Sequence, residues 1–178
     1  MQLEQTLKSL LRDVIDFPKP GIIFKDITPL LANPPVRRQV VQAIAAHFNE
    51  KGIDVVAAVE ARGFIFGMLI AQELNIPFVP IRKLGKLPYK KIHEDYALEY
   101  GAASIEMHED ALKPGARVLI HDDLLATGGT AAAAGNMIQR LGGDVAGFSF
   151  IINLAFLPGE NGLTNRFGQK PHYLVSYS

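Results

Sequence analysis

Short, almost wholly apolar runs alternate along this chain with longer segments of helical periodicity, and this alternation constrains the fold most. The apolar runs, each short enough to be a strand, are 53–59, 78–81, 116–120, 144–153 and 172–177. The segments with helical spacing of apolar residues are 3–15, 36–48, 64–74 and 130–141. Strands that alternate with helices predict an α/β fold: one mainly parallel sheet with helices on both faces. Ligands bind such sheets at the carboxyl ends of the strands, so we expect chemistry after Val59, Ile81 and Ile120.

Length and composition favour a single domain, residues 1–178, that works in the cytoplasm. No linker or internal repeat divides the chain. It has no cysteine, which excludes a disulfide framework, a zinc–thiolate site and a cysteine nucleophile. The formal net charge is zero, whereas proteins that bind nucleic acid usually carry a basic excess. The polar N-terminal residues do not resemble a signal peptide, and no run approaches the roughly 20 apolar residues of a membrane helix. We therefore expect no nucleic-acid or membrane partner.

The segment 118–130 carries the strongest functional signal. An apolar strand is followed by two acids, then by a loop of small residues and the start of a helix. Gly128 and Gly129 lack a Cβ, so the backbone can approach a ligand closely and turn its N–H groups toward an anion. The helix that begins near Thr130 adds its positive dipole end, and Thr127 and Thr130 add hydroxyl donors. The loop is therefore suited to a phosphate monoester.

The two acids before this loop, Asp122 and Asp123, indicate a second part of the same ligand. Carboxylates repel phosphate, but they accept hydrogen bonds from sugar hydroxyls and can hold the water shell of Mg²⁺. Acids and loop together suggest a ligand such as ribose 5-phosphate. The chain has neither a P-loop nor a Gly-x-Gly-x-x-Gly run, which excludes a P-loop ATPase and an ordinary dinucleotide fold. The alternative interpretation is a tight strand-to-helix turn with solvated acids.

The run Asp-Asp-Leu-Leu-Ala-Thr-Gly-Gly-Thr at 122–130 closely resembles the signature of type I phosphoribosyltransferases, which bind phosphoribosyl pyrophosphate, and in particular that of the adenine-specific members. The resemblance implies their α/β fold, with a base-binding hood at residues 1–35 and a flexible flap at residues 82–101. It also implies that Asp122 and Asp123 meet the ribose hydroxyls. The implied residues of the phosphate loop, which holds the 5-phosphate, are Ala126, Thr127, Gly128, Gly129 and Thr130. His121 departs from the family, which usually has an apolar residue there; it is either a core histidine or a group that influences the charge of Asp122.

A second run, residues 60–67, follows the strand 53–59 at the same predicted edge of the sheet. Arg62 offers a planar fork of donors that suits bidentate contact with phosphate, and Gly63 permits a sharp turn. The resemblance implies that Arg62 is a catalytic residue that binds the pyrophosphate leaving group. The alternative is a surface arginine paired with Glu60.

Five of the ten residues 82–91 are Lys or Arg, which is a local cluster in a chain of balanced charge. One interpretation is a solvated basic loop, or a surface that docks an acidic partner. The other is a mobile flap that brings positive charge to a departing pyrophosphate and excludes water. The pattern Arg-Lys-x-Gly-Lys-Leu-Pro resembles the flap of the family, and the resemblance implies that Arg82, Lys83 and Lys86 contact the pyrophosphate.

The connection 16–35 contains five prolines, which impose an irregular backbone. The N–H and C=O groups of such a backbone can read the edge of a base, and Phe24 can stack on a purine face. The resemblance assigns Phe24 to stacking, and the main chain of Ile23, Phe24 and Lys25 to adenine. The alternative is a hydrophobic N-terminal arm that closes over the core.

The resemblance implies one reaction for these sites, in which phosphoribosyl pyrophosphate and adenine give AMP and pyrophosphate, as in purine salvage. Mg²⁺ is the implied cofactor, held mainly by the substrate and by water. Glu99, in a segment 96–107 that we expect to be extended, is the implied catalytic acid–base residue near the base. The resemblance also implies a homodimer, and dimers with twofold symmetry are the commonest oligomers. The alternatives are the same chemistry on guanine, hypoxanthine or xanthine, and a regulator that senses phosphoribosyl pyrophosphate without catalysis.

Overall fold

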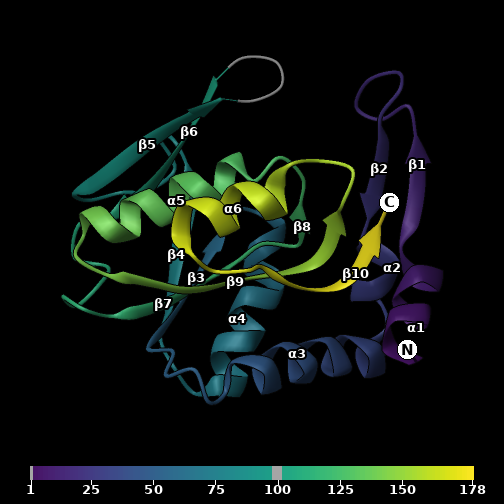
Figure 1. The fold of residues 1–178 in the computed structure, drawn as a ribbon, viewed down its shortest axis with the longest axis horizontal. Coiled ribbons are helices and arrows are strands. Elements are labelled where there is room, and N and C mark those ends of the chain that lie inside the picture. The colour runs from purple at the N-terminus through teal and green to yellow at the C-terminus, as the bar shows by residue number, and fades with distance from the viewer. Residues whose placement is uncertain (1, 98–101) are drawn as a thin grey trace.

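The computed structural model describes residues 2–97 and 102–178 and contains one large mixed sheet, which confirms the α/β prediction. Its strands are β3 Val55–Val59, β4 Phe78–Lys83, β5 Lys91–Ala97, β6 Ala102–His108, β7 Arg117–His121, β8 Leu124–Leu125, β9 Asp144–Leu154 and β10 His172–Tyr177. They lie in the order β10-β9-β7-β3-β4-β6-β5, with β8 beside β9 (Figure 1). The strands from β10 to β4 run parallel, whereas β6 pairs antiparallel with both β4 and β5.

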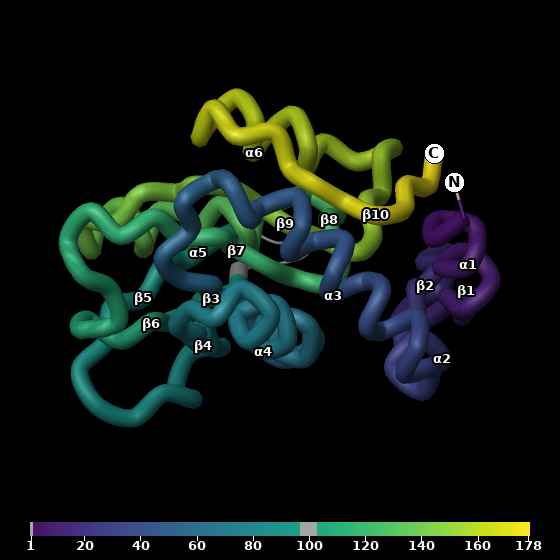
Figure 2. The backbone as a smooth tube through the Cα atoms, turned by 90° about the horizontal axis from the view of Figure 1, so that it is seen from below, coloured from purple at the N-terminus to yellow at the C-terminus, as the bar shows by residue number. Residues whose placement is uncertain are grey.

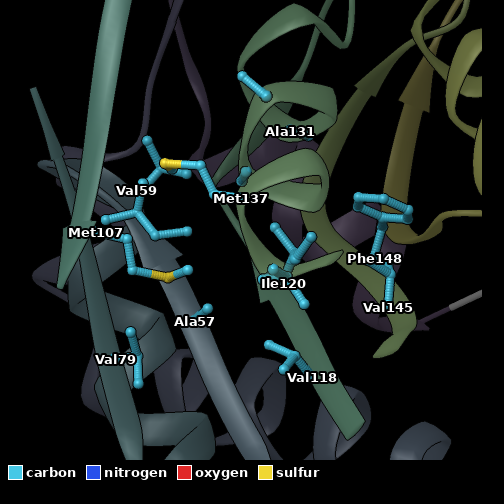
Figure 3. Close-up of a cluster of buried hydrophobic side chains, with 14 of the residues drawn as sticks. Ala57, Val59, Val79, Met107, Val118, Ile120, Ala131, Met137, Val145 and Phe148 are labelled. Carbon is cyan, nitrogen blue, oxygen red and sulfur yellow. The ribbon is translucent and has the colours of Figure 1, made fainter. Parts of the chain in front are cut away.

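Helices cover both faces of this sheet, as the alternating pattern predicted. They are α1 Gln2–Leu10, α2 Thr28–Leu31, α3 Pro34–Phe48, α4 Arg62–Leu74, α5 Gly129–Arg140 and α6 Gly159–Phe167. Neighbouring residues of one strand divide between two cores, because successive side chains of a strand point to opposite faces. In β7, Leu119 packs with α1, α3 and α4, whereas Ile120 packs with α5 and α6. Figure 3 shows Ile120, Ala57 of β3 and Met137 of α5 in the second of these cores.

The N-terminal helix is shorter than its apolar spacing predicted. We expected a helix over 3–15, but α1 ends at Leu10. The residues that follow form a strand, β1 (Arg12–Ile15), which pairs antiparallel with β2 (Ile23–Asp26) inside the proline-rich connection. β1 ends in two β-branched residues, which favour a strand once a partner strand is available. The pairing partner therefore overrides the helical spacing.

Two helices lie where no sequence pattern predicted one. α2 is a single turn within the connection 16–35. α6 contains Gly162 in its interior, and glycine disfavours a helix by about 1 kcal/mol relative to alanine. Tertiary packing offsets this cost, because Leu163 is fully buried and the ring of Phe167 lies 5.3 Å from that of Phe148 in β9.

The β1–β2 ribbon and the β5–β6 hairpin rise from the same side of the sheet and frame the space between them (Figure 1). Both views place the β1–β2 ribbon beside the end of β10 (Figure 1 and Figure 2). Within the described residues, no helix is long and apolar enough to cross a membrane.

Candidate active site

The phosphate loop, residues 126–130, connects β8 to α5 and lines a pocket. Gly128 adopts a φ of +81°, a left-handed conformation that its lack of a Cβ permits, and it is the N-cap of α5. The positive end of that helix dipole therefore points to the loop. The pocket has a volume of about 80 Å³ and is lined by Asp122, Leu124, Leu125, Ala126, Thr127, Gly128, Gly129, Thr130, Ala131 and Phe150. The structure thus brings all five predicted phosphate residues around one cavity, with Asp122 at its side.

The start of α6 supports this loop from behind. A Cβ on Gly159 would lie 2.3 Å from the carbonyl oxygen of Ala126, and a Cβ on Gly128 would lie 3.1 Å from the Cα of Gly159. Because backbone touches backbone here, a side chain at Gly159 would displace the loop. Reasoning from the sequence missed this contact. The available signal was the adjacent pair Pro158 and Gly159, which indicates a turn but not its partner.

Asp122 and Asp123 directly follow β7; Asp123 is buried and Asp122 is half-buried. Asp123 is 3% exposed, and its main-chain N–H donates a 2.9 Å hydrogen bond to Oδ1 of Asp122. Burial raises the pKa of Asp122 well above its usual value, and the nearby charge of Asp123 raises it further. Burial also raises the pKa of Asp123, although Arg62 acts against this. Two crowded carboxyl groups of this kind favour hydroxyl donors or a cation as ligands.

Arg62, the first residue of α4, connects three of the predicted sites. Its Nε lies 3.0 Å from Oδ2 of Asp123, and its Nη1 donates a 3.2 Å hydrogen bond to the carbonyl oxygen of Lys25. Its guanidinium carbon lies 4.6 Å from the centroid of the Phe24 ring. The turn before α4 contains a cis peptide bond between Glu60 and Ala61. The structure therefore places Arg62 between the ribose acids and the hood.

The contact between Arg62 and Asp123 is an ion pair rather than a hydrogen bond. Within residues 2–97 and 102–178, the buried Oδ2 of Asp123 accepts no hydrogen bond. A buried carboxylate oxygen without a donor is costly. Oδ2 therefore retains the capacity to accept a hydrogen bond, and the side chain that covers it is Arg62.

Glu60 pairs with Arg82, and not with Arg62 as the alternative interpretation held. Nη2 and Nε of Arg82 lie 2.8 and 3.1 Å from the two carboxylate oxygens of Glu60, which also accept the main-chain N–H of Lys83 at 3.1 Å. These contacts with Arg82 lower the pKa of Glu60 and raise that of Arg82. Nη1 of Arg82 donates to the carbonyl oxygen of Lys86. Arg82 therefore stabilises the start of the flap, and the side chains of Lys83 and Lys86 are exposed.

The extended segment expected at 96–107 is confirmed where it is described, because β5 and β6 form an antiparallel hairpin. Glu99, the predicted acid–base residue, lies outside the described residues. At the foot of the hairpin, Glu106 is fully buried, accepts the main-chain N–H of Leu87 at 2.5 Å and pairs with Lys91 at 3.3 Å. Sequence reasoning missed Glu106, although a single acid between Ile105 and Met107 in an apolar strand was a signal.

The three predicted base-binding residues, Ile23, Phe24 and Lys25, all lie in β2. The ring of Phe24 packs edge-on against Phe17 at 5.2 Å and faces Arg62 on its other side. Ile23 is 53% exposed, so the ribbon is not a closed part of the core. The hydrophobic-arm interpretation holds for the end of the connection, where Ile27 and Leu30 are buried in the core, but not for the exposed Ile23 in β2.

His121 is a core histidine, the first of its two predicted alternatives. It is fully buried, and its Nδ1 lies 2.7 Å from the hydroxyl oxygen of Ser149 on the neighbouring strand. Burial lowers its pKa to about 3, so the ring is neutral near pH 7. A neutral ring adds no charge next to Asp122.

Comparisons with known proteins agree with this geometry. The family model described as "Phosphoribosyl transferase domain" matches residues 26–154. The adenine phosphoribosyltransferase of Cytophaga hutchinsonii is 55% identical over 161 residues, which cover 90% of this chain and 89% of that protein. The crystal structure of adenine phosphoribosyltransferase from Rhodothermus marinus is 47% identical, has a TM-score of 0.93 and covers 99% of both chains.

A third relative was solved with ligands. The adenine phosphoribosyltransferase of Trypanosoma brucei, in complex with AMP, pyrophosphate and ribose-5-phosphate, is 26% identical, with a TM-score of 0.90, over 99% of this chain and 80% of that one. The identity to the first two relatives extends over nearly the whole chain. This extent, the fold and the convergence of the predicted sites lead to one conclusion: the chain belongs to the adenine phosphoribosyltransferase family and has the type I phosphoribosyltransferase fold.

Proposed function

We propose that the protein transfers the 5-phosphoribosyl group of phosphoribosyl pyrophosphate to adenine and releases AMP and pyrophosphate. The observation that carries this proposal is the position of Arg62. Its side chain contacts Asp123 beside the phosphate loop, the main chain of Lys25 and the ring of Phe24. A ribose on Asp123 and a base on Phe24 would thus meet around one cation. Membership of the family supports adenine as the base.

The ribose 5-phosphate part of the substrate would use the phosphate loop and the two acids. Loop N–H groups, threonine hydroxyls and the α5 dipole bind the 5-phosphate, and Asp122 and Asp123 accept hydrogen bonds from the 2- and 3-hydroxyls. Oδ2 of Asp123 is buried beneath Arg62. Arg62 must therefore turn away from Asp123 when the ribose binds, and a pyrophosphate on C1 offers it a stronger anionic partner.

The displacement itself depends on preplaced positive charge. As the bond between C1 and the pyrophosphate lengthens, negative charge grows on the leaving group and positive charge on the ribosyl ring. Arg62, Arg82, Lys83 and Lys86 would stabilise the first of these, which is the kind of electrostatic contribution that usually dominates. For Arg82 this requires a change of partner from Glu60. We propose that Glu99 manages the proton of the base, and that closure of the flap keeps water from C1.

Mg²⁺ is the cofactor that we propose. The substrate and water would supply most of its ligands, and Asp122 and Asp123 would hold its water shell. The buried, undonated Oδ2 of Asp123 fits this role, since it can accept a hydrogen bond from a water bound to the ion. The described residues contain no group of three or more His, Cys, Asp or Glu that could hold a metal. When bound, the ion would neutralise charge on the pyrophosphate.

We further propose that the protein works as a cytoplasmic homodimer. Ile65 and Met68 expose 39% and 50% of their surface on α4, and apolar surface of this kind is typical of contacts between subunits. Sedimentation equilibrium should then give about twice the chain mass of 19.4 kDa. A single species of the chain mass at micromolar concentration would contradict the dimer.

The test of the activity is a competition between bases. The purified protein is mixed with phosphoribosyl pyrophosphate, Mg²⁺ and equal concentrations of adenine, guanine, hypoxanthine and xanthine, and the nucleotides formed are separated. We expect AMP as the dominant product. Another monophosphate would preserve the phosphoribosyl site but overturn the role assigned to residues 23–25. No nucleotide, with phosphoribosyl pyrophosphate still bound, would instead support a regulator.

A further inference from the structure

The side chain of Lys25 points away from the face of β2 that carries Phe24. Successive residues of a strand point to opposite sides, and Phe24 stands toward Arg62. Lys25 is only 9% exposed, and its ammonium lies 2.6 Å from Oδ1 of Asp13 and 3.8 Å from the ring centroid of Tyr177. A cation in this position does not lie against a base stacked on Phe24. Its role must be sought in the two partners it has.

These partners connect the hood to the main sheet. Asp13 lies directly opposite Lys25 in the β1–β2 ladder, so their ion pair stays within the ribbon. Tyr177 is the last residue of β10, where it lies opposite Leu154 of β9. Figure 1 shows the end of β10 beside the ribbon. The contact between Lys25 and Tyr177 therefore bridges two parts of the fold that share no ladder of hydrogen bonds.

Of the two contacts, the one with Tyr177 is the one that reaches outside the ribbon. Asp13 is 53% exposed, so water has access to the ion pair from the side of its carboxylate. A largely buried ammonium over an aromatic ring is stabilised by the ring, because little water competes for the cation. Burial and the charge of Asp13 raise the pKa of Tyr177, so its ring stays a neutral phenol at pH 7.

The main chain of the same residue is held from the other side. The carbonyl oxygen of Lys25 accepts the hydrogen bond from Nη1 of Arg62 at 3.2 Å. Lys25 is thus fixed by Tyr177 through its side chain and by Arg62 through its backbone. These two contacts hold the end of residues 23–25, whose main-chain polar groups would read the edge of adenine.

We propose that Lys25 and Tyr177 form a hood latch, which sets the affinity for adenine by positioning the main chain of residues 23–25. Tyr177 is then a positioning residue that acts on the base from the far end of the chain without touching it. The inference rests on the proposed function, because it concerns the base-binding half of that site. The latch assigns the positioning of the adenine-binding main chain to two side chains that do not touch the base, those of Lys25 and Tyr177.

The test compares two substitutions of Tyr177. Tyr177→Leu removes the aromatic face, and we expect it to raise KM for adenine by roughly three- to tenfold, the range for a lost cation–π contact at a partly desolvated site. KM for phosphoribosyl pyrophosphate and kcat should keep their wild-type values. Tyr177→Phe is the matched control: it keeps the ring and loses only the hydroxyl, so all three constants should stay as in the wild type.

A double-mutant cycle separates a latch from general destabilisation. Lys25→Met removes the charge at similar volume, and in combination with Tyr177→Leu it should raise KM for adenine no further than either change alone. The latch is overturned if Tyr177→Leu leaves KM for adenine unchanged, if Tyr177→Phe behaves like Tyr177→Leu, or if KM rises in parallel for both substrates.

Failure of the proposed function would be recognised separately. If the wild type forms no AMP, the base-binding role falls, and amide hydrogen exchange of residues 23–26 then tests the latch itself. Exchange that is faster in Tyr177→Leu than in Tyr177→Phe supports the mechanical connection. Equal exchange in the two variants refutes it.

Discussion

At the scale of single residues, Arg62 shows why a guanidinium is needed at the start of α4. Its Nε meets Asp123 while its Nη1 meets the carbonyl oxygen of Lys25, and its guanidinium carbon lies 4.6 Å from the centre of the Phe24 ring. The donors of a lysine ammonium all belong to one atom, whereas the guanidinium spreads its donors over three nitrogens and so reaches partners that lie apart. The guanidinium of Arg62 is also suited to bind a pyrophosphate, so Arg62 can leave Asp123 and bind the leaving group instead.

His172, at the start of β10, makes stability depend on pH. Its ring stacks on that of His47 at 3.9 Å, and Nζ of Lys51 lies 2.8 Å from Nε2 of His47. Burial lowers the pKa of His172 to about 4, and the positive charges of His47 and Lys51 act in the same direction. The folded protein therefore resists a proton that the unfolded chain accepts near pH 6.5.

We expect this histidine to reduce the free energy of unfolding as the pH falls from about 6.5 to 4, because the unfolded state binds the extra proton. At pH 5 the full shift would cost about 2 kcal/mol, which partial solvent access reduces to about 1 kcal/mol. Urea denaturation at pH 7 and pH 5 measures the difference. His172→Phe keeps a stacked ring without titrating, so its stability should fall by about 1 kcal/mol less than that of the wild type.

The comparison of the two proteins isolates His172 from the buried acids. The raised pKa of Asp122 stabilises the fold as the pH falls, which is the opposite direction, and it does so equally in both proteins. The same dependence on pH in wild type and His172→Phe would show that the histidine is not responsible.

At the scale of elements, α6 matters because its first residue, Gly159, contacts the phosphate loop. The phosphate loop is held between the start of α5 and the start of α6, where Gly159 meets the carbonyl oxygen of Ala126. At the other end of α6, the ring of Phe167 lies against Gly135 of α5, and a Cβ on Gly135 would lie 2.5 Å from that ring. A helix of poor intrinsic propensity thus serves as a rigid support for the loop.

We therefore expect Gly159→Ala to raise KM for phosphoribosyl pyrophosphate and to lower the free energy of unfolding by about 1–3 kcal/mol, as overpacking does. Steady-state kinetics and urea denaturation provide the two values. Gly162→Ala is the control in the same helix, since a Cβ there meets nothing within 4 Å. It should leave KM unchanged and stabilise the protein by roughly 0.5–1 kcal/mol. If the two variants have the same KM, α6 does not support the loop.

At the scale of the whole molecule, the sheet supports two cores and presents one working edge. Val56 and Leu119 bind α1, α3 and α4 to one face, and Ala57 and Ile120 bind α5 and α6 to the other. The β1–β2 ribbon and the strands β5 and β6 rise beyond the same side of the sheet (Figure 1). The predicted site residues that the structure describes lie along the main sheet or in the β1–β2 ribbon, which contacts that sheet through Lys25 and Tyr177, so we propose that residues 1–178 act as one domain.

A ligand that binds only the folded domain should stabilise all of it. Ribose 5-phosphate at 100 times its Kd should raise the free energy of unfolding by about 2.7 kcal/mol. The double substitution Asp122→Asn and Asp123→Asn should reduce this gain at the same concentration, because each charged acceptor of a ribose hydroxyl is replaced by a weaker neutral one. Inorganic phosphate should stabilise wild type and variant equally, since the phosphate loop is intact. If ribose 5-phosphate stabilises the variant as much as the wild type, the assignment of Asp122 and Asp123 to the ribose hydroxyls is wrong.

Much of the site could be predicted because the residues that form it are neighbours in the sequence. The acids at 122–123 and the loop at 126–130 are contiguous, so strand, turn and helix start already require their present arrangement. The same holds for Arg62 at the first turn of α4. The strand at residues 12–15 could not be predicted in this way. Their apolar spacing is compatible with a helix, and pairing with β2 makes them a strand.

The sequence alone therefore determined the alternation of strands and helices, the anion-binding loop and the order of the sites along the chain. Only the tertiary structure decided that Arg62 contacts Asp123 and Lys25, that Glu60 pairs with Arg82, and that Tyr177 lies under the Lys25 ammonium. The physical reason is one of range. Backbone propensity and turn chemistry act between near neighbours, whereas the partner of a long charged side chain depends on how distant elements pack.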